Sequence, residues 1–353
     1  MCRVCIMIKN FKNILVVRTD KLGDVILTTP ALQCLREAYP KARITLLVAP
    51  ALREIVESNP FIDEILVDDR TGEHKWLFGF IKLVLFLRKK KFDLAINYHT
   101  KKRTNVLCFL AGIPHRTGYK NNKFGFLLTH PIVDKRHWGE KHESEYCLDV
   151  LRYLDVSVAR KEFFVTISKE AEDWLDAFLK KNNIASSDRV IVIHPGASDP
   201  ARRWPGYYFA ELIRLIHTVY PSCFIIIGNK DIHSIAENFI QSGSTPIIDL
   251  TGKTNLSQLA SLIKRSDLLI SNDSGPVHLA TGLSRPVVAI FTRNQKGINP
   301  KRWGPLGPKA RVVSVPEDNS ISFVTAKAVN ADYLELIKPQ EVFEAVDAVL
   351  KTC

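Results

Sequence analysis

Residues 190–198 have the sequence Val-Ile-Val-Ile-His-Pro-Gly-Ala-Ser, and residues 268–276 have the sequence Leu-Leu-Ile-Ser-Asn-Asp-Ser-Gly-Pro. Each apolar run predicts a strand, and the small residues that follow it predict a tight turn into a helix. Such a turn brings backbone N–H groups and the positive end of the helix to the carboxyl edge of the strand, where they attract phosphate. Because Arg202 and Arg203 follow the first turn, the two turns together indicate a ligand with a diphosphate.

Strands and helices alternate on both sides of these turns. In the first half we expect strands at 13–18, 43–48, 64–67 and 93–97, with helices from the turn 19–24 to about 39, after Pro50, and at 76–87, 105–110 and 143–154. In the second half we expect strands at 189–194, 223–228, 247–250, 268–271 and 287–291, with helices at 169–181, 207–219, 231–241, 256–264, from 274 onward, and at 340–350. This alternation predicts an α/β fold with a doubly wound, mainly parallel sheet in each half.

The length of 353 residues predicts two domains, because a single core seldom grows beyond roughly 250–300 residues. The patterning is weakest near residues 157–170, so we expect one domain at 1–165 and a second at 166–353. Ligands of open α/β sheets bind at the carboxyl ends of the strands, which predicts an active site in the cleft between the two domains.

The chain is basic. Its 49 Lys and Arg residues exceed its 37 Asp and Glu residues, and the net charge of +12 favours a phosphorylated substrate, an acidic membrane surface or nucleic acid as partner. Nucleic acid is the least favoured, because no aromatic-rich RNA-binding motif and no zinc-finger spacing occurs. Seven cysteines, an odd number, do not suit a disulfide framework. Lys9 and Lys12 interrupt the apolar start before it reaches the length of a signal peptide, so we expect a cytoplasmic protein.

The longest apolar run, 76–87, is interrupted by Gly79 and Lys82 and is shorter than the roughly 20 residues that cross a bilayer. It predicts a buried core helix, followed by Lys89-Lys90-Lys91 and the strand at 93–97. The alternative is a helix that lies on a membrane and carries a basic collar. The core helix is the favoured interpretation, because buried apolar helices are common in α/β domains.

Asp24 follows Gly23 in the turn after the first strand. One interpretation is that Asp24 caps the helix, and the other is that it acts as a general base on an attacking hydroxyl. A helix N-terminus stabilises a carboxylate and thereby weakens it as a base. Asp20, in the same turn, is the second candidate for the base.

Arg202 and Arg203 lie between the first phosphate-type turn and Trp204-Pro205. Arginine presents a fork of donors that matches phosphate oxygens, so one of the two could stabilise charge on a departing nucleoside diphosphate. The alternative is a solvated pair beside a packed Trp204.

In the second turn, Ser274 and Gly275 let the backbone approach a phosphate. His278 lies one helical turn further on and faces the same way. Asp273 either caps the helix or binds a hydroxyl of the ligand.

Several motifs are absent. Without G-x-G-x-x-G or G-x-x-x-x-G-K-[ST], a dinucleotide oxidoreductase and a P-loop NTPase are disfavoured, and H-E-x-x-H and G-x-S-x-G are missing too. No D-x-D occurs, so a metal-chelated sugar nucleotide is not indicated. The charge of a diphosphate would then be neutralised by Arg, Lys and helix N-termini.

Three stretches, in order and at the right spacing along nearly the whole chain, resemble glycosyltransferase family 9, the bacterial lipopolysaccharide heptosyltransferases. The first is Arg18-Thr19-Asp20-Lys21-Leu22-Gly23-Asp24-Val25 with Thr28-Thr29-Pro30-Ala31-Leu32. The second is His194-Pro195-Gly196-Ala197 with Arg203-Trp204-Pro205, and the third is Ser271-Asn272-Asp273-Ser274-Gly275 with His278. Weaker similarities are Arg302-Trp303-Gly304-Pro305, His142-Glu143 and Pro339-Gln340-Glu341-Val342.

The resemblance implies a GT-B fold, in which two Rossmann-like domains with mainly parallel sheets face each other across a cleft, and it implies no essential metal and no cofactor. Members of the family transfer heptose from ADP-L-glycero-β-D-manno-heptose to a lipopolysaccharide core acceptor, with inversion. The N-terminal domain binds the acceptor and the C-terminal domain binds the nucleotide-sugar donor.

The resemblance also assigns residues. It implies that the catalytic base is Asp24, that the phosphate-binding lysine of the family is replaced by Arg202, and that the remaining donor-binding residues are Ser198, Asp273, Ser274, Gly275 and His278. Arg202 keeps the positive charge of the lysine but changes its geometry. Asp20 and Lys21 occupy positions that are small or hydroxyl-bearing in some members, so we expect them to bind the acceptor and to alter its recognition.

We therefore expect an inverting glycosyltransferase, peripheral on the inner face of the cytoplasmic membrane, with an ADP-sugar donor and an anionic, lipid-linked saccharide acceptor. One alternative is a family 9 enzyme that uses a different nucleotide sugar. Another is a non-catalytic protein that binds nucleotide sugars, which single-turnover transfer would exclude. A basic nucleic-acid-binding module is the last, and steep salt dependence of binding to random DNA would identify it.

Overall fold

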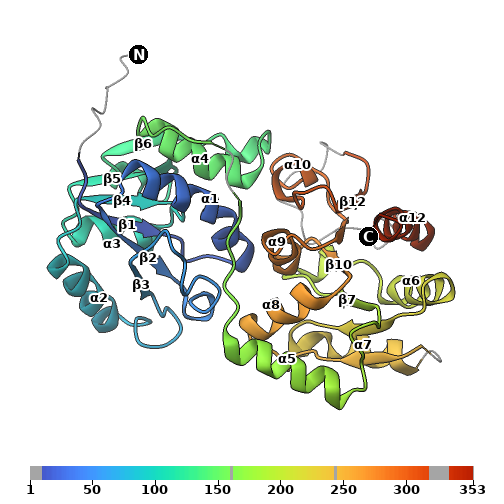
Figure 1. Cartoon of the computed structure of the whole chain (residues 1–353). Coiled ribbons are helices and arrows are strands. Elements are labelled where there is room, and N and C mark those ends of the chain that lie inside the picture. Colours follow the sequence, from blue (N-terminus) through green and yellow to red (C-terminus); the bar gives the residue numbers. More distant parts are fainter. Residues whose placement is uncertain (1–9, 160–161, 242–244, 318–333, 353) are drawn as a thin grey trace. The chain divides into compact units, whose positions relative to one another are not determined.

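The computed structural model describes residues 10–159, 162–241, 245–317 and 334–352. They form two compact units (Figure 1). The N-terminal unit comprises Met1–His137 and Glu143–Thr166, and the C-terminal unit comprises Trp138–His142 and Ile167–Cys353. The zone of the expected domain boundary, 157–170, includes residues 160 and 161, which lie outside the described residues.

The described part of the N-terminal unit contains a sheet of six strands. They are β1 (Asn13–Val17), β2 (Arg43–Val48), β3 (Glu64–Val67), β4 (Leu94–Asn97), β5 (His115–Lys120) and β6 (His130–Val133). Their order is β3-β2-β1-β4-β5-β6, and every neighbouring pair is parallel. The two central strands, β1 and β4, are almost completely buried, as expected for parallel strands covered on both faces.

Helices cover both faces of this sheet (Figure 1). Helices α1 (Leu22–Ala38) and α4 (Glu143–Tyr153) pack against each other. Helices α2 (Leu77–Lys89) and α3 (Lys102–Leu110) share a core with Leu15 and Val17 of β1. Short 3-10 turns are at Pro50–Leu52, Gly125–Leu127 and Arg136–Trp138.

Helix α1 continues past a proline in its interior. Pro30 has no N–H group to donate to the carbonyl of Ile26. The hydroxyl of Thr29 donates to that carbonyl instead, at 2.7 Å. The carbonyl of Ile26 is thus satisfied, and the helix continues to Ala38.

The described part of the C-terminal unit also contains a sheet of six strands. They are β7 (Val190–His194), β8 (Cys223–Ile226), β9 (Ile247–Asp249), β10 (Leu268–Asn272), β11 (Val287–Phe291) and β12 (Ala310–Ser314). The order is β12-β11-β10-β7-β8-β9, again with every pair parallel. In both units, therefore, the first strand lies beside the fourth.

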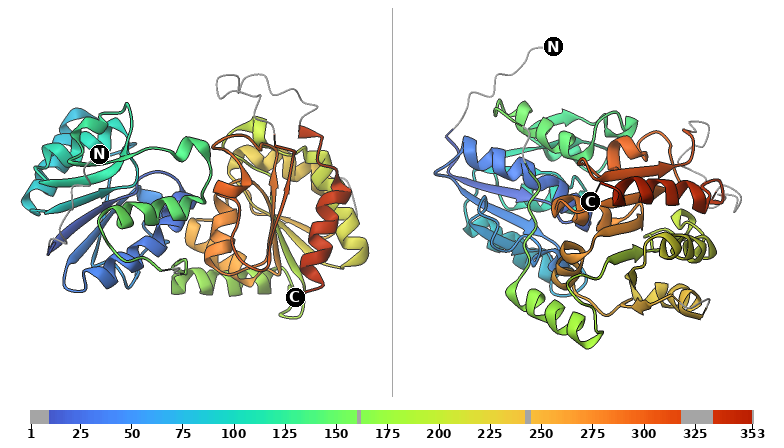
Figure 2. Two further views of the ribbon diagram at one scale, coloured as in Figure 1. Left: turned by 90° about the horizontal axis from the view of Figure 1, so that it is seen from above. Right: turned by 45° about the vertical axis from the view of Figure 1, so that its right-hand side comes forward.

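The helices of the C-terminal unit are α5 (Lys169–Lys181), α6 (Gly206–Val219), α7 (His233–Gln241), α8 (Leu256–Arg265), α9 (Gly275–Gly282), α10 (Pro300–Trp303) and α12 (Pro339–Leu350), with 3-10 turns at Pro200–Arg202 and Lys230–Ile232. Helices α6, α7 and α12 bury their apolar sides in one core with the sheet. Figure 2 shows α12, in red, beside α6. Helices α5, α8 and α9 pack in succession.

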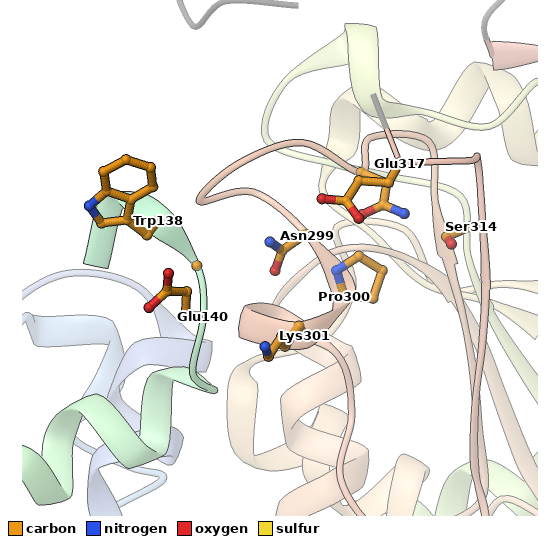
Figure 3. A pocket seen from close by; sticks show the side chains of 9 residues that line it. Trp138, Glu140, Asn299, Pro300, Lys301, Ser314 and Glu317 are labelled. Atoms are coloured by element: carbon orange, nitrogen blue, oxygen red, sulfur yellow. The ribbon is translucent and has the colours of Figure 1, made fainter. Parts of the chain in front are cut away.

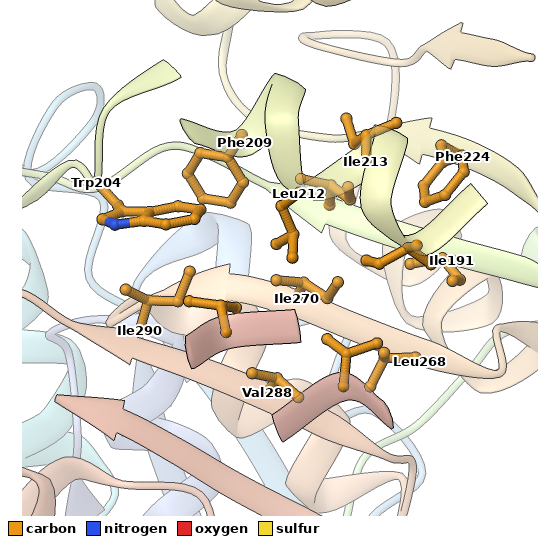
Figure 4. Packing of buried hydrophobic residues seen from close by; sticks show 14 of the residues in the cluster. Ile191, Trp204, Phe209, Leu212, Ile213, Phe224, Leu268, Ile270, Val288 and Ile290 are labelled. Atoms are coloured by element: carbon orange, nitrogen blue, oxygen red, sulfur yellow. The ribbon is translucent and has the colours of Figure 1, made fainter. Parts of the chain in front are cut away.

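Trp204 anchors the loop between β7 and α6 in this core (Figure 4). Its ring is 1% exposed and contacts the Phe209 ring edge-on, with 4.8 Å between centroids. Its indole N–H donates to the carbonyl of Ile337 at 2.9 Å, and its backbone N–H donates to Asn272 Oδ1 at 3.1 Å. The loop that carries Arg202 is thereby fixed to the end of β10.

The predicted α/β fold, with a parallel sheet in each half, is confirmed. The helix predicted after Pro50 is wrong, because the chain forms only the 3-10 turn Pro50–Leu52 there. Strands β5, β6 and β12 were not predicted. They contain polar side chains such as His115, Arg116 and Arg311, which interrupt the apolar runs by which buried strands are identified.

The apolar run 76–87 forms a core helix on one side only. Leu83, Val84 and Leu87 of α2 are buried, whereas Phe78 is 88% exposed. Among the described residues, no helix combines the length and the hydropathy that crossing a membrane requires. The favoured interpretation of this run was therefore only half right.

Candidate active site

Each sheet has a topological switch point at its centre, where the strand order reverses. In the N-terminal unit this point lies between β1 and β4, and in the C-terminal unit it lies between β7 and β10. Ligands of open α/β sheets bind outside the carboxyl ends of the strands at such points. The predicted turns follow β1, β7 and β10, so the strand order puts all of them at switch points. His194 is the last residue of β7, and Ser271 is the next-to-last residue of β10. The two are register partners in the sheet.

Arg18 is the centre of a buried ionic cluster at the end of β1. Its side chain is 2% exposed, and its guanidinium donates to Asp24 Oδ1 at 2.8 Å and to Glu143 Oε1 at 3.2 Å. Nη1 donates to the backbone carbonyl of Tyr98, directly after β4, at 3.1 Å. Asp20 Oδ1 lies 3.3 Å from Nε. One guanidinium therefore faces three carboxylates.

Asp24 lies inside the first turn of α1. The N-cap residue is Lys21, so the interpretation of Asp24 as the cap is wrong. The backbone carbonyl of Asp24 accepts hydrogen bonds from the Thr28 hydroxyl at 2.8 Å and from Arg18 Nε at 3.0 Å. The side chain is 14% exposed. The side chain is thus mostly buried, and its carboxylate is held in place by Arg18.

The pKa of Asp24 is shifted upward. Burial raises the pKa from 3.8 to about 7; the Arg18 guanidinium opposes the shift, and the charges of Asp20 and Glu143 add to it. The expected weakening of this base by the helix N-terminus is therefore outweighed by burial. A group that titrates near neutrality is both ionised and proton-accepting at neutral pH, which is what a general base requires.

Asp20 and Lys21 have different surroundings. Asp20 belongs to the Arg18 cluster and is 19% exposed. Lys21 is exposed at the start of α1. The structure thus brings Asp20 next to Asp24 and leaves Lys21 at the rim of the cluster.

Sequence reasoning assigned no role to Arg18 or Glu143. A charged residue at the end of a buried strand, with acidic residues two and six positions later, is a local pattern that could have identified Arg18. Glu143, which is 3% exposed, is 125 residues from Arg18, so no local pattern connects them.

Arg202 connects the two predicted turns of the C-terminal unit. Its Nη1 donates to Asp273 Oδ2 at 3.1 Å and its Nη2 donates to Ser198 Oγ at 2.7 Å. Its backbone carbonyl accepts a hydrogen bond from the Thr292 hydroxyl at 3.1 Å. With Arg202 18% and Asp273 14% exposed, the ion pair is partly shielded from water. The solvated surface pair considered for the two arginines does not describe Arg202.

Arg203 has a different set of contacts. Its Nη2 lies 2.5 Å from Asp231 Oδ2, and it donates to the carbonyl of Ala197 from Nε at 3.3 Å and from Nη2 at 3.2 Å. These contacts tie the turn after β7 together. Of the two arginines, Arg202 is therefore the one that meets both predicted turns.

Ser274 is the N-cap residue of α9, and Gly275 is its first residue. The alternative in which Asp273 caps this helix is wrong. The hydroxyl of Ser274 lies 2.9 Å from Nδ1 of His194, and that of Ser271 lies 3.3 Å from it. Burial lowers the pKa of His194 to about 4, with the Arg203 charge adding to the shift, so the ring is neutral at pH 7. Sequence reasoning gave His194 no role; here it orients the serine at the helix end.

His278 lies on α9 and is buried. Its ring and the Trp303 ring of α10 meet edge-on, with 6.4 Å between centroids and an angle of 61°. The structure thus supports the expected position of His278 one turn beyond Gly275 and adds α10 as its neighbour.

A pocket of about 420 Å³ lies elsewhere in the C-terminal unit (Figure 3). It is lined by Trp138, Gly139, Glu140, Asn294, Asn299, Pro300, Lys301, Ser314 and Glu317. None of the predicted donor-binding residues lines it. Within the described ranges, no three His, Cys, Asp or Glu side chains group in a way that could hold a metal ion.

Known proteins resemble this chain over most of its length. A family model described as glycosyltransferase family 9 (heptosyltransferase) matches residues 80–331. Lipopolysaccharide heptosyltransferase 2 of Escherichia coli K12 is 27% identical over 366 residues, which cover 96% of this chain and 98% of that one. The structure of a family 9 glycosyl transferase from Veillonella parvula has a TM-score of 0.86 and 28% identity, over 97% of this chain and 98% of that one. The structure of E. coli ADP-heptose lps heptosyltransferase II shares the fold, with a TM-score of 0.76 and 24% identity over 96% of this chain and 99% of that one.

Proposed function

Because the chain belongs to glycosyltransferase family 9, we propose that it transfers heptose from ADP-L-glycero-D-manno-heptose to a lipopolysaccharide core acceptor, with inversion. The observation that carries the proposal is the grouping of Ser198, Arg202 and Ser274 at the switch point of the C-terminal sheet. Positive charge and a helix N-terminus at this point suit a diphosphate. The names of the relatives, lipopolysaccharide heptosyltransferases, support the sugar and the acceptor.

Asp24 is the proposed general base. It takes the proton of the acceptor hydroxyl while the hydroxyl oxygen attacks the anomeric carbon of the donor, and the bond from that carbon to the diphosphate breaks. One displacement of this kind inverts the anomeric configuration. Proton uptake is favourable because burial disfavours the ionised carboxylate of Asp24, and the neighbouring charges of Asp20 and Glu143 add to this effect, whereas Arg18 opposes it.

Arg202 and the first turn of α9 are proposed to hold the departing ADP. As the bond breaks, negative charge grows on the diphosphate, and a guanidinium and free N–H groups fixed beforehand stabilise it. Ser198 and Asp273 hold Arg202 in place, and the neutral His194 orients the Ser274 hydroxyl. Gly275 and His278 complete the proposed donor site, and the positive charge for the diphosphate comes from Arg202 and the helix end.

The acceptor is proposed to be an anionic, lipid-linked saccharide at the inner face of the cytoplasmic membrane. The net charge of +12 supports an anionic acceptor and an anionic surface. Asp20 and Lys21 are the proposed acceptor-binding residues, because they lie beside the base and at the rim of its cluster.

The nucleotide sugar can be tested directly by calorimetric titration without added metal. We expect the purified protein to bind ADP-heptose in preference to ADP-glucose, UDP-glucose and GDP-mannose. A preference for one of the other three would overturn the donor and keep glycosyl transfer. If the protein binds none of the four nucleotide sugars, the proposed donor site is wrong. If it binds a donor but transfers no sugar in a single-turnover experiment, a non-catalytic protein is favoured.

The dependence of transfer on pH follows from Asp24. A base acts only when it is ionised, so with a pKa of about 7 we expect kcat/KM to rise about tenfold per unit below that pH and to level off above it. The measurement is kcat/KM at fixed ionic strength from about pH 5 to pH 9, a range that extends about two units to either side of the pKa of Asp24. A profile that is flat through neutrality would contradict the role of Asp24.

A further inference from the structure

Helix α2 consists of large apolar residues apart from Gly79, Lys82, Arg88 and Lys89, but protein covers only one of its sides. The covered side carries Leu83, Val84 and Leu87, which are buried in the core shared with α3 and the sheet. The other side, together with the preceding tryptophan, we call the outer face of α2; its exposed fractions are Trp76 72%, Leu77 70%, Phe78 88%, Ile81 44%, Leu85 53% and Phe86 46%.

The outer face is continuous. Leu77, Ile81 and Leu85 are spaced four residues apart, so they form one row along the helix, and Phe78 lies next to that row. Single exposed apolar residues are ordinary on protein surfaces, whereas a continuous group of large ones marks a binding surface.

The surroundings of the outer face are basic. Residues 75–91 contain six Lys or Arg residues and no Asp or Glu. Lys82 lies 3.3 Å from Glu73, and Lys90 pairs with Glu64. Within the part of the chain that the structure describes, Arg88, Lys89 and Lys91 form no ion pair and are exposed. Their charges are therefore available to a partner.

Elements next to α2 also expose large apolar side chains. Helix α3, which packs beside α2 (Figure 1), exposes 47% of Phe109 and 44% of Leu110. The 3-10 turn that packs on α3 exposes 73% of Phe126. Lys102 and Arg116 lie over nearby phenylalanine rings. Exposed apolar side chains and basic side chains thus occur together around α3 and the 3-10 turn beside it.

We propose that the outer face of α2 binds the surface of a membrane that contains anionic lipids. The apolar side chains enter the boundary between headgroups and acyl chains, and Arg88, Lys89 and Lys91 contact lipid phosphates. Charge decides against a second copy of this chain as the occupant, because two copies would bring the same basic helix together. The inference rests on the proposed function only for the reason that such a protein would bind a membrane. Lipid binding itself requires neither the nucleotide-sugar donor nor the saccharide acceptor.

The test is flotation of the full chain with vesicles of phosphatidylethanolamine and phosphatidylglycerol, and with vesicles of phosphatidylcholine alone. We expect binding to the anionic vesicles and weak binding to the neutral ones. The double variant Phe78→Gln/Leu85→Gln should bind the anionic vesicles with an affinity at least about tenfold lower, because it removes two large apolar side chains from the outer face. Arg88→Glu/Lys89→Glu should bind them about 25-fold more weakly, at about fivefold for each basic residue lost.

Matched controls exist in the C-terminal unit. Val219 and Ile240 are 54% and 43% exposed on α6 and α7, so Val219→Gln/Ile240→Gln makes the same chemical change away from α2. Lys180 and Lys181 occupy the last turn of α5, as Arg88 and Lys89 occupy the last turn of α2. Lys180→Glu/Lys181→Glu therefore reverses two charges at the same helix position, and both controls should bind vesicles like the unmodified chain.

Three outcomes would overturn the inference: no binding of the unmodified chain to anionic vesicles, binding that both α2 variants retain in full, or a dimer in solution that Phe78→Gln/Leu85→Gln dissociates. Transfer to a water-soluble acceptor fragment without vesicles should be the same in the α2 variants and the unmodified chain. If the unmodified chain transfers no sugar but its vesicle binding depends on α2, the proposed function is wrong and the proposed membrane-binding role of α2 is retained.

Discussion

Replacing Asp24 by Asn is expected to lower the turnover of glycosyl transfer about 10³-fold, within the range that a positioned base contributes. Asparagine has the same shape and can still accept a hydrogen bond from Arg18 through its side-chain oxygen. It cannot take a proton, so the acceptor hydroxyl would have to attack without a base. The measurement is kcat at saturating donor and acceptor, with the bound nucleotide sugar titrated in parallel to show that the donor site is intact.

Asp20→Asn is the control for this experiment. Asp20 also lies beside Arg18 and is the second candidate for the base. We expect a smaller loss, because Asp24 is the proposed base and Asp20 acts on it only through its charge. If Asp20→Asn lost more turnover than Asp24→Asn, the role of base would move to Asp20. Near-normal turnover of a folded Asp24→Asn protein would remove Asp24 from the mechanism.

Arg202→Met is expected to lower kcat about 10²- to 10³-fold, the usual loss when one donor to a developing negative charge is removed. Methionine keeps much of the side-chain length and removes the charge, so the departing diphosphate would lose its guanidinium partner. Arg202→Lys should recover a part of the activity, because it restores the charge without the planar fork. Both variants are measured by steady-state transfer and by titration with the nucleotide sugar.

Arg203→Met is the matched variant, with the same substitution one residue later. Arg203 contacts Asp231 and the Ala197 carbonyl, so we expect weaker donor binding through a looser turn and a smaller loss of kcat. A larger loss of kcat for Arg203→Met than for Arg202→Met would reverse the assignment of the two arginines.

The parts of the fold that local sequence could predict are those where a short apolar run ends in small residues. Strand β11 and helix α5 begin and end as predicted, because their patterns lie within a few residues. The family predicted from three stretches is confirmed by the family model. Polar strands such as β5 and β12 were missed because their stability comes from neighbouring strands and not from their own composition.

The candidate site was predictable only where its residues follow one another in the chain. Ser274 and Gly275 share one turn, and that turn was identified. The contact of Arg202 with Asp273 depends on β7 lying beside β10, which is decided by the packing of the whole sheet. The helix end, which weakens a carboxylate as a base, is visible in the sequence, but the burial that raises the pKa of Asp24 comes from packing and could not be predicted.

Helix α2 is a second case in which burial could not be predicted from local sequence. Its apolar composition predicted a buried helix, yet burial requires a second layer of protein on its far side. Whether such a layer exists is a property of the elements around it, and here the outer face remains exposed.

The raised pKa of Asp24 depends on the folding of the N-terminal unit, because burial in the Arg18 cluster causes it. The contacts of Arg18 join segments that lie 6, 80 and 125 residues away in the chain. Until β1, β4, α1 and α4 have come together, Asp24 is a solvent-exposed carboxylate with the ordinary low pKa of an aspartate, and it is protonated only at acidic pH. A nascent or partly unfolded chain therefore has no base with which to activate a hydroxyl, and the titration of this one side chain reports that the N-terminal unit has been assembled.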